Sequence, residues 1–89
     1  MNQLRTDLNR SFSIVRNDNV VTISTERNRF GKDQSITLVF GKVRLARLAE
    51  ERIRQSVGNW SSLRYKGTQD ELDAIAYDFG GSVDFTEVM

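Results

Sequence analysis

The sequence predicts a two-layer α+β domain in which a mainly antiparallel β-sheet packs on two helices. Two observations carry this prediction: apolar and polar residues alternate in the first half of the chain, and apolar residues recur every three or four positions in the second half. Asn, Asp and Gly separate the patterned segments. A chain of 89 residues suits one core, so residues 1–89 are expected to form a single domain.

Three strands are predicted in the first half of the chain. Apolar residues alternate with polar ones over 12–14 and 20–25, and the Asn-Asp-Asn sequence at 17–19 favours a hairpin turn because Asn and Asp tolerate left-handed conformations. Residues 35–40 restore the alternation, so a third antiparallel strand should follow and complete a meander. Residues 1–10 carry only a weak helical pattern and are expected to form a frayed or weakly docked lead-in.

The main helix is predicted over residues 42–57, where the apolar period changes from two to about 3.6. Gly41 can serve as its N-cap, and Gly58 stands where a C-cap glycine is expected. The cations of this helix would then lie on the face opposite the apolar stripe.

A second helix and a last strand are predicted near the C-terminus. Thr68 and Glu71 match a capping box, and a Gly-Gly pair ends the apolar stripe that follows. Residues 62–66 could form a short strand, and residues 83–88 predict a terminal strand at an edge of the sheet.

The inward faces of these elements define the expected core. Its members are Phe12, Ile14, Val21, Ile23, Ile36, Leu38, Phe40, Leu45, Leu48, Ile53, Leu72, Ile75 and Phe79. Trp60 is expected to cover this core rather than to bind a ligand, because its large surface helps to complete a small core.

The composition argues against catalysis. The chain has no Cys and no His, so disulfides, thiolate chemistry, the commonest general base and the commonest transition-metal ligand are absent. It contains neither of the glycine-rich nucleotide-binding motifs. We therefore expect a protein that is not an enzyme and that needs no cofactor or metal.

The sequence also predicts a cytoplasmic protein without a membrane partner. No apolar run approaches the roughly 18–20 residues that a membrane span requires. Residues 1–10 lack the apolar segment of a secretion signal.

Charge is distributed unevenly along the chain, although the net charge is only +1. Residues 1–66 hold all thirteen Lys and Arg with six Asp and Glu, and residues 67–89 hold the other six acids and no base. The first block therefore carries +7 and the second −6. Such blocks either neutralise each other in the fold or form two opposite binding surfaces.

Two basic segments are candidate binding sites. The main helix carries Lys42, Arg44, Arg47 and Arg54. Lys42 and Arg44 lie in its first turn, where the helix dipole disfavours cations, so their presence there indicates an anion-binding site. The alternative is a solvated face with Arg47–Glu51 and Glu50–Arg54 pairs. The loop near residue 30 carries the second segment, formed by Arg27, Arg29, Phe30 and Lys32.

An aromatic residue among cations can grip single-stranded nucleic acid or anchor a protein interface. The structural alternative is that Phe30 folds back onto the sheet edge.

The second predicted helix is acidic and places Asp70, Asp73 and Asp78 on its outer side. They can provide solubility, neutralise the basic helix, or dock on a basic groove of another protein in the way nucleic acid would. A carboxylate metal site is poorly supported, because neither His nor an EF-hand glycine pattern accompanies these residues.

Two functional hypotheses follow. The first is a small non-catalytic intracellular binding module, an inhibitor or regulator of phage or mobile-element type, that acts on a protein partner through charged surfaces. Near-zero net charge favours it, because a nucleic-acid binder gains by being basic throughout. The second is an RNA- or DNA-binding protein that uses the basic helix and the Arg27–Lys32 loop. The terminal edge strand would also permit a homodimer.

Overall fold

The computed structural model describes residues 12–25 and 33–88. The predictions for residues 1–10 and for the loop that carries Arg27, Arg29, Phe30 and Lys32 lie outside this part of the chain. The elements are β1 (Phe12–Asn17), β2 (Val20–Thr25), β3 (Asp33–Val39), α2 (Val43–Ser56), η1 (Val57–Asn59), α3 (Lys66–Asp78) and β4 (Ser82–Val88).

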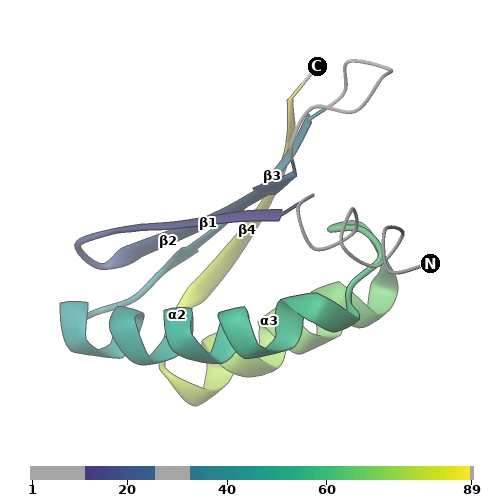
Figure 1. Ribbon diagram of the computed structural model, residues 1–89. Coiled ribbons are helices and arrows are strands. Elements are labelled where there is room, and N and C mark those ends of the chain that lie inside the picture. The colour runs from purple at the N-terminus through teal and green to yellow at the C-terminus, as the bar shows by residue number, and fades with distance from the viewer. Residues whose placement is uncertain (1–11, 26–32, 89) are drawn as a thin grey trace.

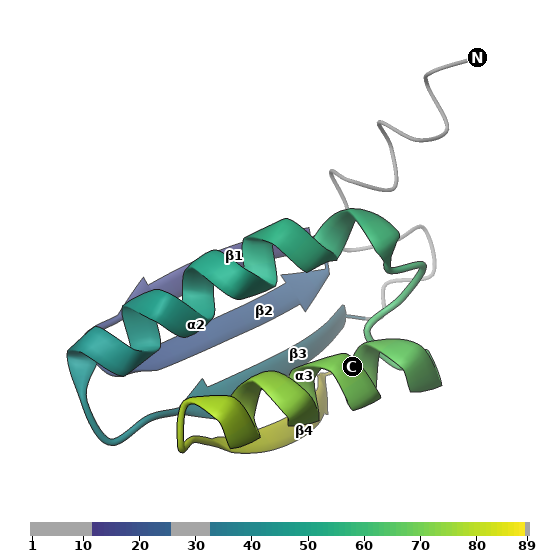
Figure 2. The same cartoon turned by 90° about the horizontal axis from the view of Figure 1, so that it is seen from below.

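The predicted α+β fold is confirmed. The four strands form one antiparallel sheet in the order β1-β2-β3-β4, and both helices lie on the same face of it (Figure 1). Seen from the helix side, α2 runs over β1 and β2, and α3 lies beside it over the half of the sheet that ends in β4 (Figure 2). The opposite face of the sheet has no helix among the described residues.

The first hairpin forms as its turn sequence predicts. Asn17 pairs with Val20, which leaves Asp18 and Asn19 as a two-residue turn. Asp18 has a φ of 54°, in the left-handed region that Asp tolerates better than most residues with a side chain. The strands on either side therefore keep the alternation read from the sequence.

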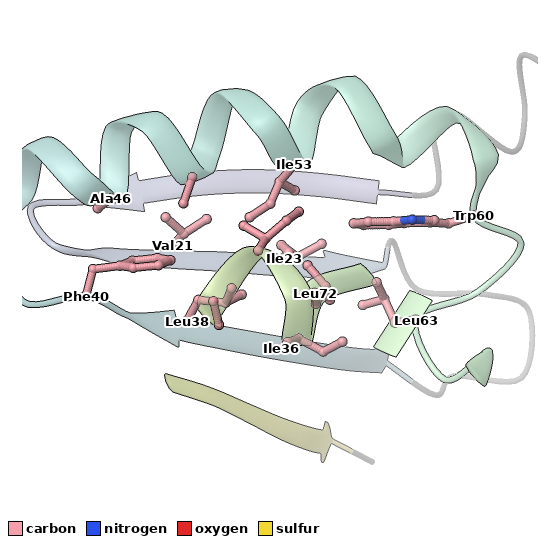
Figure 3. Close-up of a cluster of buried hydrophobic side chains, with 13 residues drawn as sticks. Val21, Ile23, Ile36, Leu38, Phe40, Ala46, Ile53, Trp60, Leu63 and Leu72 are labelled. Carbon is pink, nitrogen blue, oxygen red and sulfur yellow. The ribbon is translucent and has the colours of Figure 1, made fainter. Parts of the chain in front are cut away.

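The core lies between the sheet and the two helices (Figure 3). It buries Val21, Ile23, Ile36, Leu38, Phe40, Ala46, Ala49, Ile53, Trp60, Leu63, Leu72, Ile75 and Ala76. Trp60 is only 5% exposed and meets the ring of Phe12 edge to face at 5.7 Å. The expectation that Trp60 covers the core is confirmed.

Leu48 does not belong to this core, contrary to the sequence prediction. Its side chain is 46% exposed, whereas Ala46 and Ala49 are fully buried. Small alanine side chains let a helix approach a sheet closely, so α2 is rotated to bury the stripe that runs through Ala46, Ala49 and Ile53. Leu48 lies on the outer side of that stripe.

The ends of α2 also differ from the prediction. Its N-cap is Lys42 rather than Gly41, and no side chain caps the helix there. Gly58 lies inside the short helix η1, whose end is closed by the hydrogen bond from the Trp60 N–H to the Val57 carbonyl. The helix therefore tightens into a 3₁₀ turn instead of ending at a left-handed glycine.

The segment before α3 is a turn rather than a strand, and the helix begins earlier than the capping box suggested. Tyr65 is the N-cap, so Thr68 lies inside the first turn of α3. The buried Thr68 hydroxyl donates to the Ser62 carbonyl at 2.9 Å and ties the preceding turn to the helix. The capping-box prediction was therefore wrong, although the residue that suggested it does stabilise the helix start.

The glycine pair at the end of α3 does terminate the helix as predicted. Gly80 has a φ of +70°. Its N–H donates to the Tyr77 carbonyl, and the Gly81 N–H donates to the Ala76 carbonyl at 2.7 Å. This is the Schellman pattern, which turns the chain directly into β4.

Candidate binding surfaces

The outward face of α2 carries unpaired cations. Lys42, Arg44 and Arg47 are exposed, and none of them forms an ion pair with any residue in the described part of the chain. The predicted Arg47–Glu51 pair is not formed. An open depression of about 380 Å³ lies on this face and is lined by Arg44, Arg47, Leu48, Glu50, Glu51 and Arg54. It therefore combines both signs of charge with one exposed leucine.

Arg54 has a structural role that its place in the basic helix did not suggest. Its Nη2 lies 2.9 Å from Glu50 Oε2, as the predicted i, i+4 pair requires, and also donates to the Ile14 carbonyl of β1 at 3.0 Å. The second Glu50 oxygen, Oε1, accepts a hydrogen bond from Arg16 Nε at 2.9 Å. Arg54 is thus already bound within the fold.

This network shifts the acidity of its central carboxylate. The hydrogen bond from Arg54 does most to hold the pKa of Glu50 below its ordinary value, partial burial opposes the shift, and Arg16 supports it. The charged form of Glu50 therefore tightens the contact between α2 and β1.

Sequence reasoning missed Arg16, although a signal was present. Arg16 shares the alternation of Phe12 and Ile14, so it is placed on the strand face that meets the helix layer. A cation in such a row needs a carboxylate partner from the covering element. Glu50 is that partner.

One flank of α3 is used to hold α2. Asp78 Oδ2 lies 3.0 Å from Arg52 Nη2, and the Ser56 hydroxyl donates to Glu71 Oε2 at 3.1 Å. Arg52 also lies over the ring of Phe79, at 5.8 Å from its centre. Asp78 is therefore turned toward the basic helix and is not on the outward face, where the sequence placed it.

The outward face of α3 is acidic and exposed. Asp70, Asp73 and Tyr77 are spaced at i, i+3 and i+7, so they share one side of the helix. Tyr77 is 87% exposed, and neither aspartate has an ion-pair partner among residues 12–25 and 33–88. Within that part of the chain, one ion pair joins α2 to α3, so the two charge blocks lie side by side without cancelling.

No metal-binding cluster is seen in the described ranges, where no three acidic side chains gather closely enough to hold an ion. None of the helices described has the length and apolar character that crossing a bilayer demands.

The comparisons with known proteins supply no relative. No family model matches the chain, and no curated protein or solved structure gives a significant match.

Proposed function

We propose that this protein is a small non-catalytic binding module, of phage or mobile-element type, that inhibits or regulates a cytoplasmic protein through the acidic face of α3. The observation that carries the proposal is the exposed set Asp70, Asp73 and Tyr77, which no charged group in the described part of the chain neutralises.

The chemistry of this face suits a basic protein surface. Carboxylates that are held apart on a rigid helix steer a cationic partner and favour one orientation of it. Tyrosine is a frequent anchor of protein interfaces because it buries a large area with few rotatable bonds. Tyr77 is almost fully exposed and follows Asp73 by one helical turn, so it can fill a pocket while the aspartates meet cations around it. A groove that ordinarily holds nucleic acid is a basic protein surface of this kind.

Charge reversal tests the proposal. The immobilised protein should capture a partner from a host lysate, and the Asp70→Lys/Asp73→Lys double variant should lose it. Glu51→Lys is the matched control, because Glu51 is exposed on α2 and forms no ion pair in the described residues. Short duplex DNA should compete with capture if the partner uses a nucleic-acid-binding groove. If every captured protein is retained by the double variant, the acidic face is not the docking surface.

Nucleic-acid binding is the second candidate. It is favoured by Lys42, Arg44 and Arg47, which form no ion pair with any residue of 12–25 or 33–88. Labelled RNA and DNA titrated at two salt concentrations distinguish the two functions. Tight binding that weakens steeply with salt and is lost in Arg44→Glu/Arg47→Glu supports this candidate. An absence of binding at low salt removes it.

A further inference from the structure

The sheet has two edges, formed by β1 and β4, and only one of them is blocked within the described residues. A free strand edge exposes backbone N–H and C=O groups that can pair with another chain. On β1, the Arg54 guanidinium donates a hydrogen bond to the carbonyl of Ile14, which points away from the sheet. An added strand would have to displace Arg54 from this carbonyl and from Glu50.

The register shows which groups of β4 face outward. In an antiparallel sheet, the N–H and C=O of one residue point to the same neighbour, and successive residues point to opposite neighbours. The Phe40 N–H donates to the Asn19 carbonyl of the β2 side. The backbone groups of Leu38 and Ile36, which follow at every second position of β3, therefore also point to β2. Thr37 therefore bonds Asp84, and the backbone groups of Val83 and Phe85 point away from the sheet.

The outward edge of β4 lacks the two residue types that most directly protect an edge strand, Lys and Pro. Its sequence, SVDFTEV, contains no Lys and no Pro. Seven residues are long enough for a stable added strand. Nothing among the described residues pairs with its outer side.

The surroundings of this edge are negative. Asp84 is exposed on the open face of the sheet, and Glu87 adds a second acid to the strand. Asp73 lies about opposite Glu71 and Asp78 around α3, which places it on the flank away from α2 and toward β4. Carboxylates therefore border the edge from both layers.

This charge argues against a second copy of the chain as the occupant. Two β4 strands paired edge to edge and antiparallel would bring both exposed Asp84 side chains to one face of the joined sheet, and like charges across paired strands are destabilising. A homodimer through this edge is thus disfavoured, whereas an extended segment with cations gains both backbone hydrogen bonds and charge complementarity.

From these observations we infer that β4 accepts an extended segment of another protein as a fifth strand, with Lys or Arg at alternate positions. This inference rests on the proposed function, because it specifies the part of the basic partner that the acidic end of the chain engages. Because alternate side chains of a strand share one face, the cations of this segment meet Asp84 where they face the open side of the sheet, or Asp73 where they face the helix layer.

Amide hydrogen exchange followed by NMR tests the inference residue by residue. The probe is a blocked peptide of about eight residues that alternates Lys with Val, and the controls alternate Glu with Val or replace the valines by Pro. In the free protein, the Val83 and Phe85 amides should exchange at least about tenfold faster than the Asp84 amide, which is bonded to β3. The Lys-Val peptide should slow the two outward amides by about tenfold or more, and neither control peptide should do so. Binding of the Lys-Val peptide without protection of these amides overturns the inference, as does their protection in a dimer of the protein alone.

A backbone substitution provides a second test. Glu87→Pro removes an N–H that points away from the sheet, because Glu87 lies two residues after Phe85 and its backbone groups point the same way. No hydrogen bond to β3 is lost, and proline is tolerated at such edge positions. Its control, Glu87→Gln, removes the charge and keeps the N–H. The proline variant should weaken peptide binding about tenfold more than the glutamine variant. Equal weakening by the two variants overturns the inference.

The failure of this inference can be told apart from failure of the proposed function. If Asp70→Lys/Asp73→Lys loses the cellular partner while the outward amides are never protected, the acidic face stands and the added strand does not. If the amides are protected but the partner is retained by that variant, the added strand stands and the acidic face of α3 does not.

Discussion

At the scale of single residues, the tightest constraint in the described chain is the junction between α3 and β4. A Cβ placed on Gly81 would lie 2.5 Å from two ring carbons of Phe40 and 2.9 Å from the Val39 carbonyl oxygen. Phe40 is itself 2% exposed, so its ring cannot move without disturbing the core. The glycine is thus required by packing rather than by backbone conformation.

Gly81→Ala should therefore destabilise the fold by about 1–3 kcal/mol, the usual cost of overpacking a core. Gly41→Ala is the matched control: nothing lies within 4 Å of a Cβ there, so its effect should stay within about 0.5 kcal/mol. Chemical denaturation of both variants and the parent protein measures these differences. Equal stabilities for the two variants would show that the Phe40 ring yields to the added methyl group.

At the scale of elements, α2 is tied to β1 by a charge network as well as by the core. Glu50 accepts from Arg16 on the strand and from Arg54 on its own helix, and its pKa is lowered mainly by Arg54. A carboxyl whose pKa is lower in the folded state stabilises the fold above its unfolded pKa, near 4.5. That contribution is lost as the pH falls through the lower, folded value.

Glu50→Gln should consequently cost about 1 kcal/mol near neutral pH and progressively less below about pH 4. The free energy of unfolding of the parent and variant, measured from about pH 7 to pH 3, checks the sign of this dependence. Glu51→Gln serves as the control, because Glu51 forms no ion pair in the described residues. A stability gap for Glu50→Gln that persists unchanged in acid would contradict the role assigned to the network.

Sequence patterns predicted the strands of the sheet but not the rotation of α2 about its axis. Burial of one face fixes the register of a strand, so β1 and β2 appear where the alternation placed them, and β3 spans Asp33–Val39 instead of the predicted 35–40. The rotation of α2 could not be read in the same way, because Ala46 and Leu48 fit helical stripes that differ by about half a turn. Which stripe is buried depends on how closely the helix meets the sheet, and that is a tertiary property.

The start of α3 illustrates a second limit. A Thr followed three residues later by a Glu is the same signature at an N-cap and inside a first turn. Thr68 lies inside the first turn of α3, where its hydroxyl donates a hydrogen bond to the Ser62 carbonyl. That carbonyl comes within reach only when the preceding turn has folded. Local rules therefore located the helix but misplaced its first residue.

At the scale of the whole molecule, the sequence predicted two charge blocks but not how they would meet. Their meeting depends on the rotation of both helices, which places Arg52 and Asp78 between the helices and leaves Arg44 and Asp70 on outer faces. The helix layer is held chiefly by buried Ile53, Leu72 and Ile75. The ion pair adds little, because its side chains are 43% and 48% exposed.

A double-mutant cycle of Arg52→Gln and Asp78→Asn tests this picture of the whole molecule. The coupling energy should be about 0.2–1 kcal/mol, as is usual for exposed pairs, and the cycle cancels the separate contact of Arg52 with Phe79. It should fall toward zero in about 1 M salt, where screening acts over only a few ångströms. A coupling above about 2 kcal/mol that survives high salt would mean that the charge blocks hold the helices together. A small, salt-sensitive coupling instead leaves the remaining charges of both helices available to partners, as a module that binds through charged surfaces requires.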